Sequence, residues 1–295
     1  MPVVFDLETG DPDDIITLVL LCVHTKCDIL ACSVFPGGTE QIGFVKALLR
    51  YLGVNIPVGR CRDLGSTTKK HLNERSYARL FPDIKWQKEE ADGFGHDIFA
   101  QVIKKVPNVT IITGAPLENV ANTINKHPDI KIKSLFSQGG FAGSRCIPEE
   151  HRLPKFKDKE YMHTWNFGGN LQASKDVLAS DRIEIRHCIS KDVCHGVHFT
   201  ADLLPRLETK RSTHKGWDVF YKAMEAYLKR KPAGKLMHDP LAATAALEPA
   251  IIEFMEVEMT AKKSAFGSEP KEGTRTWISV RANQEIFHEV LFDEC

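Results

Sequence analysis

Short apolar runs alternate along the chain with stretches whose apolar residues recur at helical spacing. The runs predict strands over residues 3–5, 28–35, 109–112, 132–136 and 183–189, with a short further strand starting at Val58. The stretches predict helices over residues 13–24, 40–52, 96–105, 117–124 and 171–178. The first of these helices is apolar almost all round, as a buried helix would be. Strands that alternate with helices predict right-handed βαβ crossovers and an α/β fold whose central sheet is mostly parallel and flanked by helices.

Two regions depart from this alternation. Residues 60–95 form a long polar segment, which we expect to be an insertion, a surround of the active site or a loop-rich edge. After residue 250 the alternation of polar and apolar positions predicts antiparallel hairpins. No linker marks a domain boundary, so we expect one domain over residues 1–295.

Composition and charge exclude several classes of protein. With 42% hydrophobic and 26% charged residues, the chain has enough apolar surface to fold, which excludes a disordered protein. Lys and Arg number 39, as do Asp and Glu, and this zero net charge disfavours a nucleic-acid partner. The longest apolar stretch is far short of the ~20 residues that a membrane span needs. With no basic leader or cleavage site after Met1, we expect a cytoplasmic protein.

The densest chemical signal lies between the first strand and the first helix. Five of the nine residues in 6–14 are acidic: Asp6, Glu8, Asp11, Asp13 and Asp14. Acids near a helix start are favoured by the helix dipole and by capping, so a well-capped helix with Asp11 as N-cap is one interpretation. Capping needs only one or two acids, and five repel one another unless a cation neutralises them. The cluster therefore favours a site for a hard divalent cation.

Three further segments carry candidate chemistry. Residues 237–243 place His238 and Asp239 before a proline at the start of an Ala-rich helix; an N-cap Asp would explain this pattern alone, but the adjacent imidazole adds a possible proton donor. Residues 110–119 place a tight turn at the end of a strand, where α/β sheets bind ligands. Residues 164–170 supply amides and aromatic rings suited to sugar hydroxyls and a flat ring.

These four segments, in this order, resemble the nucleoside hydrolase family of the inosine–uridine-preferring type, over roughly residues 3 to 250. The family's Asp-x-Asp-x-Gly-x-Asp-Asp motif is matched by Asp6, Glu8, Gly10, Asp13 and Asp14, with Glu for the second Asp and one extra residue after Gly10. Residues 113–119 match its Thr-Gly-x-Leu-Thr-Asn turn with one insertion, Gly139-Gly140 its Gly-Gly strand end, and residues 238–242 its His-Asp-Pro-x-Ala. Two ribose contacts differ, because Thr164 replaces a glutamate and Gly38 an asparagine.

The resemblance implies a calcium-dependent hydrolase of ribonucleosides that releases ribose and a free base, as in purine or pyrimidine salvage. Its Ca²⁺ would be held by carboxylates of Glu8, Asp14 and Asp239 and by the main-chain carbonyl of Thr113. Glu8 would also deprotonate the attacking water, and His238 would protonate the departing base. Asp13 and Asn166 would hold ribose hydroxyls, whereas Asp6 would be a ligand or a support behind the ligands. The partner is then a small-molecule nucleoside, with no membrane, and a homo-oligomer is possible.

Two other interpretations stay open at the level of sequence. A binding module that keeps the fold without turnover would explain the altered positions Gly38 and Thr164. A phosphatase of the Asp-x-Asp type would also place carboxylates after a first strand, with an aspartate nucleophile and magnesium. Glu8 at the second acidic position and the distant His238-Asp239-Pro240 argue against the phosphatase.

Overall fold

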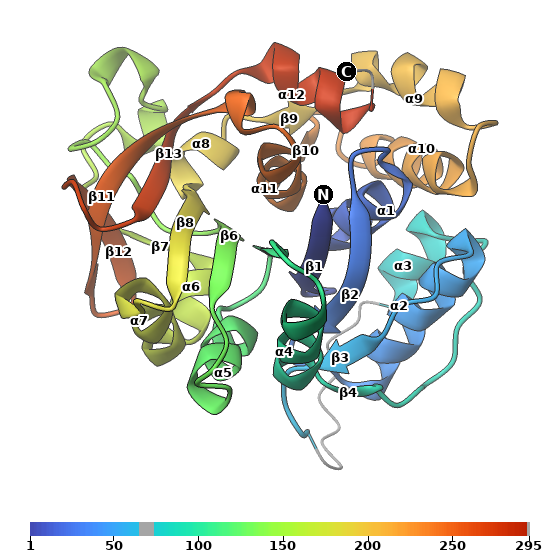
Figure 1. Ribbon diagram of the computed structural model, residues 1–295. Helices are drawn as coiled ribbons and strands as arrows, with labels where there is room; N and C mark the ends of the chain where they lie inside the picture. The colour runs from blue at the N-terminus through green and yellow to red at the C-terminus, as the bar shows by residue number, and fades with distance from the viewer. Residues whose placement is uncertain (65–73, 294–295) are drawn as a thin grey trace.

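A computed structural model describes residues 1–64 and 74–293 of the chain. Its core is an eleven-stranded sheet (Figure 1). In order across the sheet, the strands are β4 (Gly93–Phe94), β3 (Val58–Arg60), β2 (Asp28–Val34), β1 (Pro2–Leu7), β5 (Thr110–Thr113), β6 (Ile132–Gln138), β8 (Ile183–Ile189), β13 (Thr276–Ala282), β11 (Ile252–Lys262), β12 (Ala265–Pro270) and β7 (Met162–His163). A separate two-stranded sheet pairs β9 (His198–Phe199) with β10 (Lys235–Leu236).

The large sheet is parallel from β4 to β13 and antiparallel beyond. Each neighbouring pair from β4 through β8 runs parallel, and β13 also pairs in parallel with β8. The pairs β13–β11, β11–β12 and β12–β7 are antiparallel. The predicted α/β fold with a mostly parallel sheet and antiparallel strands near the C-terminus is therefore confirmed.

Helices cover both faces of the sheet, as each face of a parallel sheet requires. One apolar cluster includes residues of α1 (Pro12–Val23), α2 (Thr39–Leu52), α3 (Glu74–Leu80), α9 (Leu204–Lys210), α10 (Lys215–Leu228), α11 (His238–Leu247) and α12 (Gln284–Leu291). A second includes residues of α4 (Gly95–Lys105), α5 (Glu118–Lys126), α6 (Trp165–Gly169) and α7 (Leu171–Ala179). The short helix α8 (Lys191–Cys194) and four single 3-10 turns (Glu149–His151, Pro154–Phe156, Ala201–Leu203 and Pro249–Ile251) complete the described elements.

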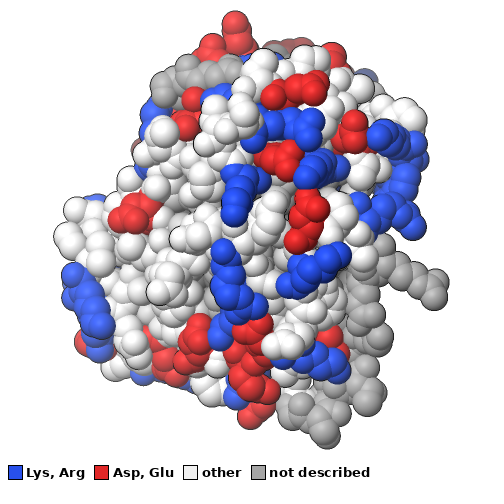
Figure 2. All heavy atoms as spheres, turned by 90° about the vertical axis from the view of Figure 1, so that its right-hand side faces the viewer, with Lys and Arg blue, Asp and Glu red and all other residues white. Residues whose placement is uncertain are grey.

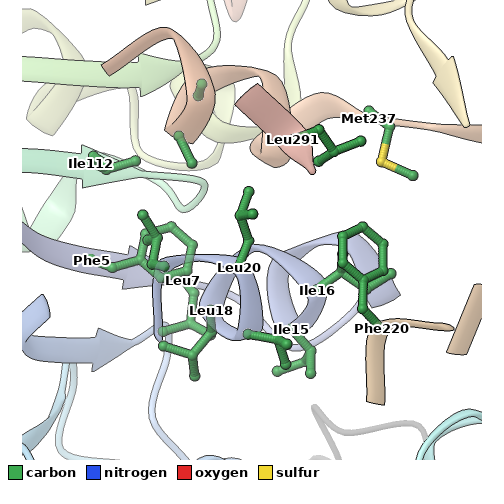
Figure 3. Close-up of a cluster of buried hydrophobic side chains, with 14 of the residues drawn as sticks. Phe5, Leu7, Ile15, Ile16, Leu18, Leu20, Ile112, Phe220, Met237 and Leu291 are labelled. Atoms are coloured by element: carbon green, nitrogen blue, oxygen red, sulfur yellow. The ribbon is translucent and has the colours of Figure 1, made fainter. Parts of the chain in front are cut away.

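Helix α1 is buried on nearly all sides, and this fixes the position of its N-terminus. It packs on the sheet, α10 and α11, and Figure 3 shows its side chains between Phe5 and Leu7 of β1 and Phe220 of α10. Each fully buried Leu or Ile contributes roughly 1.5–3 kcal/mol. The acids in the first turn of α1 are therefore carried on a rigid support.

The polar segment over residues 60–95 contributes more regular structure than a loop. It contains α3 and the edge strand β4, and Tyr77 of α3 packs edge-on against Phe44 of α2 with ring centroids 4.8 Å apart. Residues 65–73 of the segment lie outside the described residues. The segment therefore extends the core beside α2 and α10 as well as the edge of the sheet.

The surface carries both signs of charge. Figure 2 shows Lys and Arg interspersed with Asp and Glu on the face where α2, α3, α9 and α10 lie in Figure 1. The Nζ atom of Lys222 on α10, for example, lies 2.6 Å from Asp83 and 2.7 Å from Asp218. Within residues 1–64 and 74–293, no helix is long and apolar enough to cross a membrane.

Candidate active site

A cleft of about 430 Å³ opens at the carboxyl ends of β1, β5 and β6. This is the edge at which open α/β sheets bind ligands. The cleft is lined by Glu8, Gly10, Asp11, Asp13, Asp14, Gly114, Gln138, Trp165, Asn166, His238 and Asp239. The acidic segment, the turn after β5, the amide-rich segment and the His-Asp-Pro segment are thus brought to one place.

Three buried aspartates form the acidic centre of the cleft. Asp13 and Asp14 lie in the first turn of α1, and Asp239 lies in the first turn of α11, whose N-cap is Met237 rather than Asp239. One carboxylate oxygen from each lies within 4.8 Å of the other two. The pKa values of Asp14 and Asp239 are raised well above the usual value for an aspartate. Burial is the largest cause, and the negative charges of neighbouring carboxylates add to it. Ionised together, these aspartates need a cation between them.

The donor atoms suit a hard divalent cation. All three side chains offer carboxylate oxygens, which Ca²⁺ and Mg²⁺ prefer. The chain after β5 passes close to the Asp239 carboxyl group. A Cβ atom on Gly114 would lie only 2.5 Å from that group, so the position has no room for a side chain. Thr113 precedes this glycine, so its main chain passes close to the cluster. Its hydroxyl lies 3.4 Å from Asp6 Oδ2 and accepts a hydrogen bond from the Ala115 N–H at 3.1 Å.

Glu8 follows β1 and points its carboxylate to Trp165. The Trp165 Nε1–H donates to Glu8 Oε2 at 2.7 Å, while the Glu8 backbone N–H donates to Asp14 Oδ1 at 2.7 Å. Burial raises the pKa of Glu8 to about 7, partly offset by the hydrogen bond from Trp165. A carboxylate with a pKa near neutrality is suited to general-base chemistry. The side chain is near the three aspartates but is not one of the converging group.

Asp6 lies behind the cleft rather than in it. Its side chain is fully buried in β1, where Oδ1 accepts from Asn119 Nδ2 at 2.7 Å. Burial, the largest cause, raises the pKa of Asp6 to about 8. The contacts of Asp6 with Asn119 and Thr113 connect the ends of β1 and β5 to α5. This position is that of a support for the cleft.

His238 and Asn166 line the same cleft as the aspartates, His238 from the start of α11 and Asn166 from α6. His238 begins α11, and its Nε2 is buried without a hydrogen-bond partner among the described residues. Burial, followed by the charge of Lys235, lowers the pKa of His238 to about 4, so its ring is neutral at pH 7. The amide of Asn166 donates from Nδ2 to the carbonyl oxygen of Gln138 at 3.0 Å and to its side-chain Oε1 at 2.9 Å. β6 therefore fixes the orientation of Asn166.

Thr164 lies beside the cleft and does not line it. It is 5% exposed, and its Oγ1 atom has no hydrogen-bond partner among the described residues. It lines a neighbouring cavity of about 380 Å³ together with Trp165 and Lys191. A threonine at this position offers no carboxylate to the cleft.

Sequence reasoning missed two residues of the site. Trp165 was recognised only as part of an amide- and aromatic-rich segment, although its ring is 79% exposed at the cleft. Lys235 was not identified at all, yet its Nζ lies 2.9 Å from Asp11 Oδ1 and 3.1 Å from Asp13 Oδ1. Asp11 occupies the N-cap position of α1, as the capping interpretation expects, but its side chain makes no capping hydrogen bond. A single lysine three residues before His238 forms no sequence pattern from which its contacts with Asp11 and Asp13 could be predicted.

Solved structures similar to this chain include nucleoside hydrolases. A purine-preferring ribonucleoside hydrolase from Gardnerella vaginalis superposes with a TM-score of 0.73 at 15% identity, covering 100% of this chain and 98% of that one. An inosine–uridine preferring nucleoside hydrolase from Bacillus anthracis gives a TM-score of 0.73 at 17% identity, covering 100% of this chain and 99% of that one. At these identities the likeness concerns the fold.

Sequence similarity extends over nearly the whole chain. An uncharacterised protein of Aquifex aeolicus (strain VF5) is 27% identical over 293 residues, which are 97% of this chain and 93% of that protein. The family model described as inosine-uridine preferring nucleoside hydrolase matches residues 3–289. The chain therefore belongs to the inosine–uridine preferring nucleoside hydrolase family, whose members are hydrolases of N-glycosyl bonds.

Proposed function

We propose that the protein hydrolyses the N-glycosidic bond of ribonucleosides, with Ca²⁺ in the cleft, and releases ribose and the free base. One observation carries the proposal: carboxylates from the N-termini of α1 and α11 converge in a cleft that also holds Glu8, His238 and Asn166. Nucleoside hydrolases are metal-dependent, and the acidic cluster is where a metal ion would bind. The cleft of about 430 Å³ is within the range of sites for small molecules.

The proposed metal ligands are those that the family resemblance implies, and the convergence of Asp14 and Asp239 supports two of them. Asp14 and Asp239 would bind Ca²⁺ through their carboxylates and Thr113 through its main-chain carbonyl, with Asp13 beside them. Glu8 would complete the set from the end of β1. When bound, the ion would orient the sugar hydroxyls and acidify a water molecule.

The protein's own side chains transfer the protons and bind the sugar hydroxyls. Glu8 accepts the proton of the attacking water, whose oxygen forms a bond to the anomeric carbon as the C–N bond breaks. The electron pair of the C–N bond leaves with the base, and His238 donates a proton to it. Asp13 and Asn166 hold ribose hydroxyls in the cleft that Glu8 and His238 also line. Burial lowers the pKa of His238 to about 4, so its ring is neutral at pH 7 in the free protein. His238 therefore transfers a proton only when bound substrate raises this pKa, and a neutral ring would donate a hydrogen bond to the base instead.

The absence of a carboxylate at position 164 favours an altered substrate or a binding module as the second candidate. The buried Thr164 hydroxyl has no partner among the described residues and would leave one substituent of the sugar without its family contact. A substrate that lacks or modifies this hydroxyl would suit the site. The assay must therefore include deoxyribonucleosides as well as ribonucleosides.

The test is hydrolysis of a nucleoside panel with added Ca²⁺, followed by the appearance of reducing sugar and free base. The same preparation is tested with p-nitrophenyl phosphate, which reports on the phosphatase alternative. Asp239→Asn serves as the matched control, because it removes one charge from the three aspartates. Release of sugar by the wild type and its loss in the variant support the proposal. Binding of nucleosides without release of sugar would instead identify a binding module.

A further inference from the structure

Lys235 is a buried cation inside the acidic site. It begins β10, three residues before His238, and its side chain is 3% exposed. Its Nζ lies 2.9 Å from Asp11 Oδ1, 3.1 Å from Asp13 Oδ1 and 3.0 Å from the Leu236 carbonyl oxygen. An ammonium group has three protons, and these three acceptors use all of them. Lys235 therefore has no donor left for a substrate and acts through the residues it holds.

The insertion in the acidic motif supplies one of these partners. The family's motif has one residue fewer between the glycine and the Asp pair, and the chain here contains Asp11 and Pro12 between Gly10 and Asp13. Asp11 does not cap α1 with its side chain but turns its carboxylate to Lys235. Asp11, in the lengthened part of the motif, and Lys235 thus form one pair. Although burial works to lower the pKa of Lys235, the charges of Asp13 and Asp11 raise it above its usual value.

The other partner, Asp13, is held at both carboxylate oxygens. Lys235 contacts Oδ1, and the backbone N–H of Asp239 lies 3.5 Å from Oδ2. Asp13 is also one of the three converging aspartates. The ammonium group is therefore beside the proposed cation site, and Asp13 is the residue that the two have in common.

We propose that Lys235 is a positioning residue that fixes the Asp13 carboxylate for a substrate hydroxyl, and that its charge weakens divalent-cation binding by the three aspartates. The inference rests on the proposed function. It implies two effects of opposite sign when the charge is removed. Cation affinity rises because a like charge is lost, whereas turnover falls because Asp13 is no longer held. A lysine that only stabilised the fold would weaken both.

The experiment uses Lys235→Met and Lys235→Gln, both of which remove the charge. Protein freed of metal with a chelator and then desalted is titrated with CaCl₂ in a calorimeter at pH 8, and kcat and KM are measured on the best nucleoside at saturating Ca²⁺. A unit charge about 6 Å from a divalent ion changes affinity by about tenfold even at the dielectric constant of water. We expect Ca²⁺ to bind at least about tenfold more tightly to either variant. Losing the charged hydrogen bond to Asp13 should lower kcat/KM by roughly ten- to a hundredfold.

Lys222→Met is the matched control. Lys222 also bridges two aspartates, Asp83 and Asp218, but it lies on α10 and does not line the cleft. Its loss should leave Ca²⁺ affinity and kcat/KM within about twofold of wild type, as for a surface ion pair.

Unchanged or weaker Ca²⁺ binding in folded Lys235 variants would overturn the inference. Failure of both variants to fold, measured by circular dichroism, would overturn it too, because the lysine would then be required by the fold. A wild type that binds Ca²⁺ but hydrolyses no nucleoside would refute the proposed function separately. In that case the effect of Lys235 on Ca²⁺ affinity would still be measurable.

Discussion

Replacing Trp165 by Phe tests whether Glu8 is the general base. The indole Nε1–H donates to Glu8 Oε2 at 2.7 Å, and Phe keeps an aromatic ring without this donor. The ring is 79% exposed, so its truncation removes little packing, and the protein should melt within a few degrees of wild type. The substitution therefore changes one hydrogen bond at the proposed base and little else.

The size of the effect follows from the geometry. A hydrogen bond to a charged group contributes about 1.5–3 kcal/mol, and exposure of the tryptophan to water places this bond at or below the lower end. One pKa unit corresponds to about 1.4 kcal/mol. Because the hydrogen bond from Trp165 lowers the pKa of Glu8, its loss should raise that pKa by up to about one unit. A bound cation lowers the pKa in both proteins alike, so the difference between them is the quantity to measure.

The assay is the dependence of kcat/KM on pH at saturating Ca²⁺. Glu8 must be ionised to accept a proton, so activity falls on the acidic side as Glu8 becomes protonated. In Trp165→Phe this acidic limb should move upward by up to about one pH unit. Well below the limb the variant should be up to about tenfold slower, and above it the two proteins should approach one another. Trp277→Phe, on β13 and outside the cleft, should leave the profile unchanged.

An acidic limb that stays in place would refute this reasoning. Glu8 would then not be the group whose ionisation limits the reaction, and Asp13 or Asp6 would be the next candidate. A uniform loss at every pH would show instead that Trp165 contacts the substrate, without any role in tuning Glu8.

Four further results are expected. Glu8→Gln should abolish turnover yet spare much of the substrate binding, because an amide cannot accept the proton of water; a loss in kcat of less than tenfold would argue against Glu8 as base. Asp14→Asn and Asp239→Asn should each lose Ca²⁺, and chelator should lower the Tm of the wild type but not of the variants. Without Ca²⁺, the pKa values of Glu8 (about 7) and Asp6 (about 8) mean that the native state keeps protons which the unfolded chain releases, so thermal melts should show stability falling as pH rises from 5 to 8. His238→Ala should cost about 10²–10⁴-fold on ordinary nucleosides but little on p-nitrophenyl riboside, and equal losses on both would remove His238 as the acid.

The fold was predictable because its signals are local. Residues 13–24 and 40–52 have helical periodicity, and the structure places α1 and α2 within one residue of these limits. The sequence also indicated that the acids after β1 and the turn after β5 would meet, since the carboxyl ends of parallel strands share one edge. These steps need only the order of the elements and the handedness of their connections.

Side-chain direction was not predictable in the same way. Spacing alone does not show that Asp13 converges with Asp14 and Asp239 while Glu8 turns to Trp165. The direction of the Glu8 side chain depends on a tryptophan that is distant in sequence. The pairing of Lys235 with Asp11 spans more than two hundred residues and follows no periodic pattern.

Two departures from the family's acidic motif each have a partner in the structure. The longer Glu8 meets the indole N–H of Trp165, and the inserted Asp11 meets the ammonium of Lys235. The contact of Lys235 with Asp11 and Asp13 leaves no unpaired buried charge at these positions, and an unpaired buried charge is costly. The other two departures, Gly38 and Thr164, are not among the residues that line the cleft, and the Thr164 hydroxyl has no hydrogen-bond partner among the described residues. The two changes in the acidic motif therefore each have a polar partner, whereas the changes at Gly38 and Thr164 alter positions where the family contacts ribose, so a modified sugar is the first substrate to test against a binding module.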